Sequence, residues 1–349
     1  MNVNYMSSLI AVVVLFLLAY VGQAIGLQVL FGIILPYLAI ITFIVGFIYR
    51  VIDWGRSPVP FRIPTTCGQQ KTLPWIKPNH IDNPTTTAGV IVRMALEILL
   101  FRSLFRNTTM ASKNGDKLTY EWEIFLWLGA LAFHYAFATV LVRHLRFFLE
   151  PVPVWLQWLQ ELDAFLQLGL PGLLLSGVVL LAAVTFLFLR RILYPHMKYI
   201  SLASDYFPLF LIFGIAATGI LMRYFTKVDL INIKALTMGL VTFHPTIPEG
   251  IGSLFYAHLL FVCVLLAYFP FSKLMHLGGI FLSPTRNLTT NVREFRHINP
   301  WNYPVKVHTY EEYEDEFREK MVEVGIPVVK ALSPEPAEPE ESEAPEEKE

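Results

Sequence analysis

Six long apolar runs, almost free of charged residues, constrain this chain more than any other feature. A run of about twenty such residues crosses the hydrocarbon core of a bilayer as a helix. Hydrophobic residues make up 54% of the sequence and charged residues only 16%, a balance that a soluble domain of this length would not bury. We therefore predict an all-α integral membrane bundle of six transmembrane helices. The expected spans are 7–25, 30–52, 122–148, 167–190, 203–225 and 253–277.

Lys and Arg residues gather in the 51–121 loop, in the short 190–202 loop and in the segment after the last span. Cytoplasmic loops of membrane proteins carry an excess of these residues. With six spans, all three segments fall on one side, so we expect this side and both termini to face the cytoplasm from a cell membrane. We call this end of the bundle the inner end and the opposite end the outer end.

The expected divisions of the chain follow from these spans. The long loop contains an amphipathic segment, Val90–Phe105, that suits a membrane surface. The charged segment Tyr310–Val324 is predicted to form a soluble helix, and the Glu- and Pro-rich composition after it predicts disorder. The predicted regions are 1–52 with two transmembrane helices, 53–121 as a cytoplasmic loop, 122–280 as a four-helix region, 281–332 as a cytoplasmic extension and 333–349 as an acidic tail.

Polar groups inside a spanning helix are costly, and they are functional candidates for that reason. The third span holds His134 and His144, ten residues apart, and the sixth holds His258 and His276, eighteen apart. Because these spans run in opposite directions, His134 should meet His276 at the inner end and His144 should meet His258 at the outer end. Facing histidines on neighbouring helices are the axial ligands that two b-type haem irons need. The spacings correspond to about 15 Å and about 27 Å of helix rise, so the helices must tilt or bend, and Pro270 is placed to kink the sixth span.

Basic residues near both ends of these spans are candidates to bind the anionic haem propionates. Arg143 and Arg146 suit the outer haem, whereas Arg190, Arg191 and Lys273 suit the inner one. Long basic side chains also reach from a helix end to the membrane interface without any ligand, and that explanation stays open.

Other classes of protein remain open from the residues alone. A haem-free transporter could relay protons along the four histidines, although the internal repeats of many transporters are not found here. A structural anchor would have no use for paired intramembrane histidines. The two cysteines, Cys67 and Cys263, are too few to hold an iron–sulfur cluster, so such a cluster would belong to a partner chain.

Several stretches resemble the respiratory nitrate reductase gamma-subunit family, a group of quinol-oxidising dihaem cytochromes b with the same ligand spacings. The resemblance implies that quinol gives electrons to the outer haem, and that they pass to the inner haem and leave to a cytoplasmic iron–sulfur subunit, or flow in reverse. The stretches are His258 to His276, Val241-Thr-Phe-His244, Arg190-Arg-Ile-Leu-Tyr-Pro195 and Leu35-Pro-Tyr-Leu38.

The extra first span and the long loop depart from a nitrate reductase gamma subunit. Loop stretches 60–71 and 93–107 look like those of the DsrM family, the cytochrome b subunits of the DsrMKJOP complexes of sulfate reducers. This resemblance implies menaquinone as the lipid substrate, a DsrK-like iron–sulfur subunit and the other DsrMKJOP subunits as partners, and no nucleic acid. Cys67 and the basic residues of the loop would then belong to the docking surface. The same cytochrome could instead serve a nitrate reductase or a heterodisulfide reductase complex.

One departure concerns the quinol site. The gamma-subunit family places a lysine in the link after the span with the first two ligands, and the corresponding link here, 149–166, has none. It offers Glu150, Glu161 and Asp163 instead. Quinol oxidation releases protons, and a carboxylate near the outer haem could accept them. These three residues are therefore candidate proton acceptors; alternatively, they only cap and solvate a short link.

Overall fold

A computed structural model describes residues 3–59, 63, 68–113, 117–164, 172–293, 304 and 307–330. The chain divides into two compact units, Met1–His297 and Ile298–Glu349, and each is described by itself. Cys67 and the acidic tail at 333–349, both named in the sequence analysis, lie outside the described residues.

Within the part of the chain that the structure describes, six helices are long and apolar enough to cross a membrane, as predicted. Their side chains remain largely exposed, which suits contact with lipid. The six segments are Asn4–Ala24, Leu30–Arg56, Ile124–Phe147, Leu175–Leu193, Ala203–Thr226 and Ser253–Phe271.

Two of the predicted boundaries differ from the helices of the structure. The helix of the fourth span begins at Leu175, because residues 172–174 are apolar but not helical, and the start predicted at 167 lies outside the described residues. The sixth span was expected to continue to 277, yet its α-helix α11 ends at Tyr268. A 3₁₀ turn at Phe269–Phe271 contains Pro270, Ser272 is extended, and a second 3₁₀ turn at Lys273–Met275 leads into the short helix α12 (His276–Gly279). Pro270 therefore belongs to the end of this helix rather than to a kink within it.

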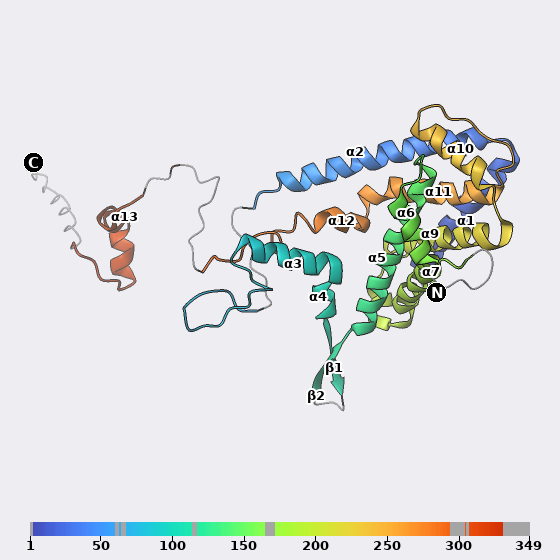
Figure 1. Cartoon of the computed structure of the whole chain (residues 1–349). Coiled ribbons are helices and arrows are strands. Elements are labelled where there is room, and N and C mark those ends of the chain that lie inside the picture. Colours follow the sequence, from blue (N-terminus) through green and yellow to red (C-terminus); the bar gives the residue numbers. More distant parts are fainter. Residues whose placement is uncertain are drawn as a thin grey trace, which may run out of the picture. The chain divides into compact units, whose positions relative to one another are not determined.

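The bundle is assembled around α11 (Figure 1). It packs against α1 (Val3–Ala24), α2 (Leu35–Arg56, preceded by a π turn at Leu30–Ile34) and α9 (Ala203–Leu221). Helix α5 (Ile124–His144) packs mainly on α7 (Leu175–Leu193), which in turn packs on α9. Helix α5 approaches α11 chiefly through side chains, so the histidines of the two helices occupy the space between their backbones.

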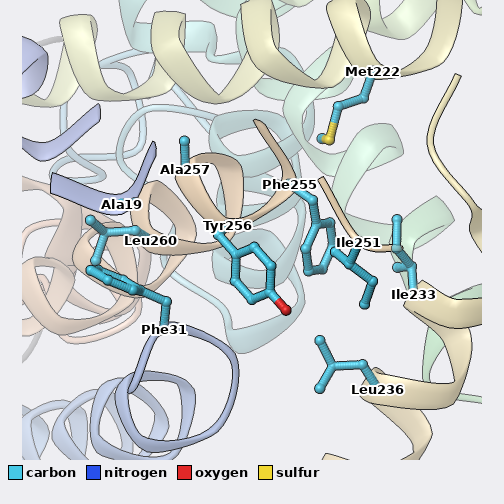
Figure 2. Packing of buried hydrophobic residues seen from close by; sticks show 10 residues of the cluster. All are labelled: Ala19, Phe31, Met222, Ile233, Leu236, Ile251, Phe255, Tyr256, Ala257 and Leu260. Carbon is cyan, nitrogen blue, oxygen red and sulfur yellow. The ribbon is translucent and has the colours of Figure 1, made fainter. Parts of the chain in front are cut away.

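The loops at the outer end contain helices that the sequence analysis did not predict. The 149–166 link includes α6 (Val154–Asp163), and the 226–252 loop includes α10 (Leu230–Val241). Figure 2 shows Ile233 and Leu236 of α10 in one apolar cluster with Phe255 and Tyr256 of α11. Leu236 is fully buried there, so α10 is an integral part of the bundle's outer end.

The inner end carries the amphipathic segment predicted at Val90–Phe105. It forms α3 (Thr87–Leu100), which is capped by the Thr86 hydroxyl at its first turn, and the one-turn helix α4 (Arg102–Phe105). A two-stranded antiparallel hairpin follows, with β1 (Thr108–Lys113) paired to β2 (Lys117–Trp122), and it was not predicted. A short turn, α8 (Pro195–Ile200), joins α7 to α9.

The second compact unit contains α13 (Tyr310–Glu323), close to the helix predicted at Tyr310–Val324. Thr309 and Glu312 form a capping box at its start. The buried Glu314 carboxylate accepts hydrogen bonds from the backbone N–H groups of Val329 and Lys330, and these bonds hold the pKa of Glu314 below its usual range.

Candidate functional site: two histidine pairs

The inner histidine pair joins α5 to α12. The ring centroids of His134 and His276 lie 5.8 Å apart, and the two ring planes are nearly perpendicular at 81°. The Nδ1 atom of His134 bonds the Ala130 carbonyl at 2.8 Å, and that of His276 bonds the Lys273 carbonyl at 2.8 Å.

The outer histidine pair joins the last residue of α5 to the first turns of α11. The ring centroids of His144 and His258 lie 6.3 Å apart, and their planes are nearly parallel at 18°. His144 Nδ1 bonds the Val140 carbonyl at 2.6 Å, whereas His258 Nδ1 lies 2.8 Å from the Thr218 hydroxyl.

These hydrogen bonds fix the tautomer of each imidazole. A carbonyl oxygen only accepts, so Nδ1 of His134, His144 and His276 must carry the proton. The Thr218 hydroxyl lies 2.6 Å from the Gly214 carbonyl and donates its single hydrogen there, so it accepts from His258 Nδ1–H. All four rings therefore have a basic Nε2 with no hydrogen-bond partner among the described residues, which is the state of an imidazole ready to bind a metal.

The geometry fits an iron held from both sides. With imidazole–metal bonds of about 2 Å, the centroids of two rings on one metal should lie roughly 6 Å apart, as both pairs do. Across the described ranges, no three His, Cys, Asp or Glu side chains gather into a bare metal site. Two protein ligands per metal are too few for such a site, and they match the axial positions of a haem.

Two buried guanidinium nitrogens also lack a protein partner. Arg223 Nε is one, and Arg223 is close enough to Arg143 to repel it electrostatically. The other is Arg50 Nε on α2. Arg50 lies in sequence between Phe47 and Trp54. The rings of these two aromatic residues approach Gly278 and Gly279 of α12, the helix that begins with His276. Each histidine pair thus has near it a half-buried arginine whose buried Nε has no hydrogen-bond partner among the described residues, which suits an anion such as a haem propionate.

The basic residues proposed from sequence already have protein partners. At the outer end, Arg143 Nε lies 2.9 Å from Asp163, and Arg146 bonds Gln160. At the inner end, the contacts are Arg190 to Glu123 at 2.8 Å, Arg191 to Ser201 at 3.1 Å and Lys273 to Asp205 at 2.6 Å. These contacts hold the side chains at the two ends of the bundle, where a propionate could share them.

The three candidate carboxylates lie in different environments. Asp163 is buried, and it accepts hydrogen bonds from the backbone N–H and hydroxyl of Ser176 in addition to its ion pair with Arg143. Glu161 is exposed on α6. Glu150 forms an ion pair with Lys234 of α10.

Glu150 and Lys234 line a cavity of about 420 Å³ beside the outer histidines. Arg146 and Phe147 form the wall nearest the pair, and the Phe147 ring lies 5.9 Å from that of His144. The rest of the wall is apolar and comes mainly from α10, namely Leu230, Ile231, Ala235 and Met238, together with Val152. An apolar cavity with a few charged groups at one side is typical of a small-molecule site.

Sequence reasoning missed Lys234, Thr218, Arg50 and Arg223. A polar residue inside an apolar span was the available signal for Thr218 and Arg50. Arg223 lies near the end of the fifth span, where a basic side chain reaches the membrane interface without any ligand. Lys234 gave no signal, because α10 was expected to be a loop.

Comparison with known proteins identifies the family of this chain. The sequence profile described as nitrate reductase gamma subunit matches residues 94–297, a range that includes all four histidines. The chain belongs to the nitrate reductase gamma subunit family. The match begins within α3, so α1 and α2 lie outside it.

Two curated relatives match a larger share of the chain than the family profile does. A protein of Archaeoglobus fulgidus is 44% identical over 281 residues, which cover 78% of this chain and 84% of the relative. A protein of Archaeoglobus profundus is 43% identical over 276 residues, covering 77% and 81% respectively. Both carry the name Hdr-like menaquinol oxidoreductase cytochrome b-like subunit. The chain is therefore similar over most of its length to two proteins whose names describe a subunit of a menaquinol oxidoreductase.

Proposed function

We propose that this chain is a dihaem cytochrome b subunit that exchanges electrons between menaquinol and an iron–sulfur partner on the cytoplasmic side of the cell membrane. The observation that carries the proposal is the set of two imidazole pairs, one at each end of the bundle, with every Nε2 left free. The names of the two relatives support the same chemistry.

His134 with His276 and His144 with His258 would be the axial ligands. When bound, two b haems would supply one-electron carriers near both faces of the membrane. The backbone carbonyls and Thr218 orient the imidazoles and raise their basicity as ligands. The residues proposed to hold the propionates are Arg143, Arg146 and Arg223 at the outer end, and Arg50, Arg190, Arg191 and Lys273 at the inner end.

The cavity beside His144 would bind the quinol head group. Quinol gives up two protons and two electrons when it becomes quinone, so the site needs a proton acceptor. Glu150 is the carboxylate that lines the cavity, and we propose it as that acceptor. Lys234 and Arg146 would stabilise negative charge on the quinol oxygen as its proton leaves. Asp163 already accepts a hydrogen bond from Ser176 and forms an ion pair with Arg143. Its proposed role is to position Arg143.

The partner is proposed from sequence and from the relatives' names. "Hdr-like" in those names favours a heterodisulfide-reductase-like partner over a nitrate reductase catalytic subunit. The resemblance of the 60–71 and 93–107 stretches to DsrM narrows this partner to a DsrK-like iron–sulfur subunit in a DsrMKJOP-type complex of sulfate reduction. Both termini would then face the cytoplasm.

Haem quantification tests the proposal directly. The purified chain should contain two haems and show a reduced-minus-oxidised b-type spectrum. His134→Ala and His258→Ala should each remove one haem, which leaves about half of the haem absorbance in either variant. A wild-type chain with no Soret change between the two redox states would instead support the haem-free transporter.

A further inference from the structure

Phe101 stands out at the inner end because its backbone is left-handed, with φ 49° and ψ 48°. A residue with a Cβ rarely adopts this conformation, because the Cβ comes too close to the following carbonyl oxygen, and glycine or asparagine is the usual occupant. A phenylalanine in this position therefore indicates that its ring makes a contact that glycine could not supply.

That contact is with an axial ligand. The Phe101 ring centroid lies 4.9 Å from that of His134, edge to face at 84°. Phe133 meets the same imidazole at 5.1 Å and 85°. Two aromatic rings therefore restrict the plane of His134, which stands nearly perpendicular to the plane of His276.

The position of Phe101 is set by α5 itself. The last carbonyls of α3 have no partner within their own helix. Trp127 Nε1 donates to the Leu100 carbonyl at 2.8 Å, and the Tyr135 hydroxyl donates to the Leu99 carbonyl at 2.9 Å. Both donors belong to the helix that carries His134, so these hydrogen bonds fix the end of α3 relative to that histidine.

The middle of α3 is attached to the segment that follows the other inner ligand. Arg93 is only 3% exposed, and its guanidinium donates to the carbonyls of Arg286, Leu288 and Asp82. Burial lowers the pKa of this guanidinium, and the nearby carboxylates of Glu97 and Asp82 oppose that shift. Thr290 N–H also donates to the Pro84 carbonyl at 2.7 Å. The segment 283–290 follows α12, so α3 connects the parts of the chain that present His134 and His276.

We propose that Phe101 is a positioning residue for the inner haem ligand: held by α3 in a left-handed conformation, its ring fixes the plane of the His134 imidazole. This inference rests on the proposed function, because it assigns the imidazole a haem iron to bind. Replacing Phe101 should therefore change the inner haem and not the outer one. Among the described ring contacts and hydrogen bonds, none joins α3 or α4 to the outer histidine pair.

The test uses the full chain with Phe101→Ala and Phe101→Leu, and with Phe125→Ala as the matched control. Phe125 lies on α5, the helix that carries His134, but its side chain is 78% exposed and its ring takes part in none of the described aromatic contacts. Electron paramagnetic resonance of the oxidised protein reports the ligand planes at each iron, and a redox titration with haem quantification reports each haem separately. The outer haem serves as the internal reference.

We expect Phe101→Ala to shift the low-spin signal and the midpoint potential of the inner haem, or to release that haem alone, while the outer haem keeps its wild-type values. Phe101→Leu, which restores volume without an aromatic edge, should give a smaller change of the same kind, and Phe125→Ala should leave both haems unchanged. Two wild-type signals in both Phe101 variants would overturn the inference. So would equal losses of both haems, or a Phe125→Ala effect as large as that of Phe101→Ala. A wild-type chain without haem would defeat the proposed function instead.

Discussion

The two histidine pairs are alike in ring separation and different in almost everything around them. At the inner pair the planes are perpendicular, the Nδ1 atoms bond only to backbone carbonyls, and Phe101 and Phe133 stand against His134. At the outer pair the planes are nearly parallel, a side chain orients one ring, and a cavity with an ion pair lies next to the other. The ligands alone do not account for this difference.

The contrast follows the chemistry proposed for each end. Quinol oxidation moves protons together with electrons, so the outer end needs a cavity, a carboxylate and an ammonium group. Electron exchange with a partner needs no proton acceptor at the inner end, and aromatic side chains fill the surroundings of His134 there. Under the proposed function, the outer end would bind the substrate and the inner end would hold a cofactor in a fixed orientation.

The largest expected effect concerns the proton acceptor proposed at the outer end. Glu150→Gln should lower the rate of menaquinol oxidation roughly 100-fold, because the cavity loses its proton acceptor. Lys234→Met should lower it in the same direction by a smaller factor. Stopped-flow reduction with a menaquinol analogue measures both rates. Glu249→Gln removes another acidic group at the outer end without touching the cavity lining and should behave as wild type.

Both variants should retain two haems, which shows that the rate change does not come from a lost cofactor. A wild-type rate in Glu150→Gln would remove the chemical distinction between the two ends.

The next effect concerns the inner end. Arg93→Met should leave the carbonyls of Asp82, Arg286 and Leu288 without their donor, at a cost of about 2 kcal/mol, or roughly 30-fold in local opening. Hydrogen exchange should accelerate in residues 283–290 and in α3, with α10 and the outer turns of α11 unchanged. Equal acceleration at both ends would mean that Arg93 stabilises the bundle as a whole.

The smallest effect tests the hydroxyl that accepts a hydrogen bond from the His258 imidazole. Thr218→Val removes the acceptor of His258 Nδ1–H and should weaken the outer haem by about 10-fold. Thr218→Ser keeps the hydroxyl and should bind haem as the wild type does. Haem retention on dilution, followed by absorbance, distinguishes the two sites. A loss of the inner haem instead would contradict the separation between the pairs.

Much of this architecture could be predicted from the sequence because lipid imposes simple rules. Apolar length identified all six spans, and antiparallel direction was enough to bring His134 to His276 and His144 to His258. Composition could not reveal α10, because its twelve residues are too short to cross a bilayer and its burial depends on α1 and α11. Lys234 was missed with it.

Other features depend on contacts distant in sequence. Apolar residues on both sides of Pro270 do not show whether a helix bends or ends there. The end of α3 before the left-handed Phe101 is held by hydrogen bonds from Trp127 and Tyr135, which come from a different helix. Local patterns contain no information about such partners.

The joint at Ser272 makes the relative heights of the two histidine pairs independent of the length of a single helix. His258 is fixed within α11, but His276 begins a separate short helix after an extended residue and two tight turns. An insertion or deletion between Phe271 and Lys273 would therefore relocate His276 without rotating His258.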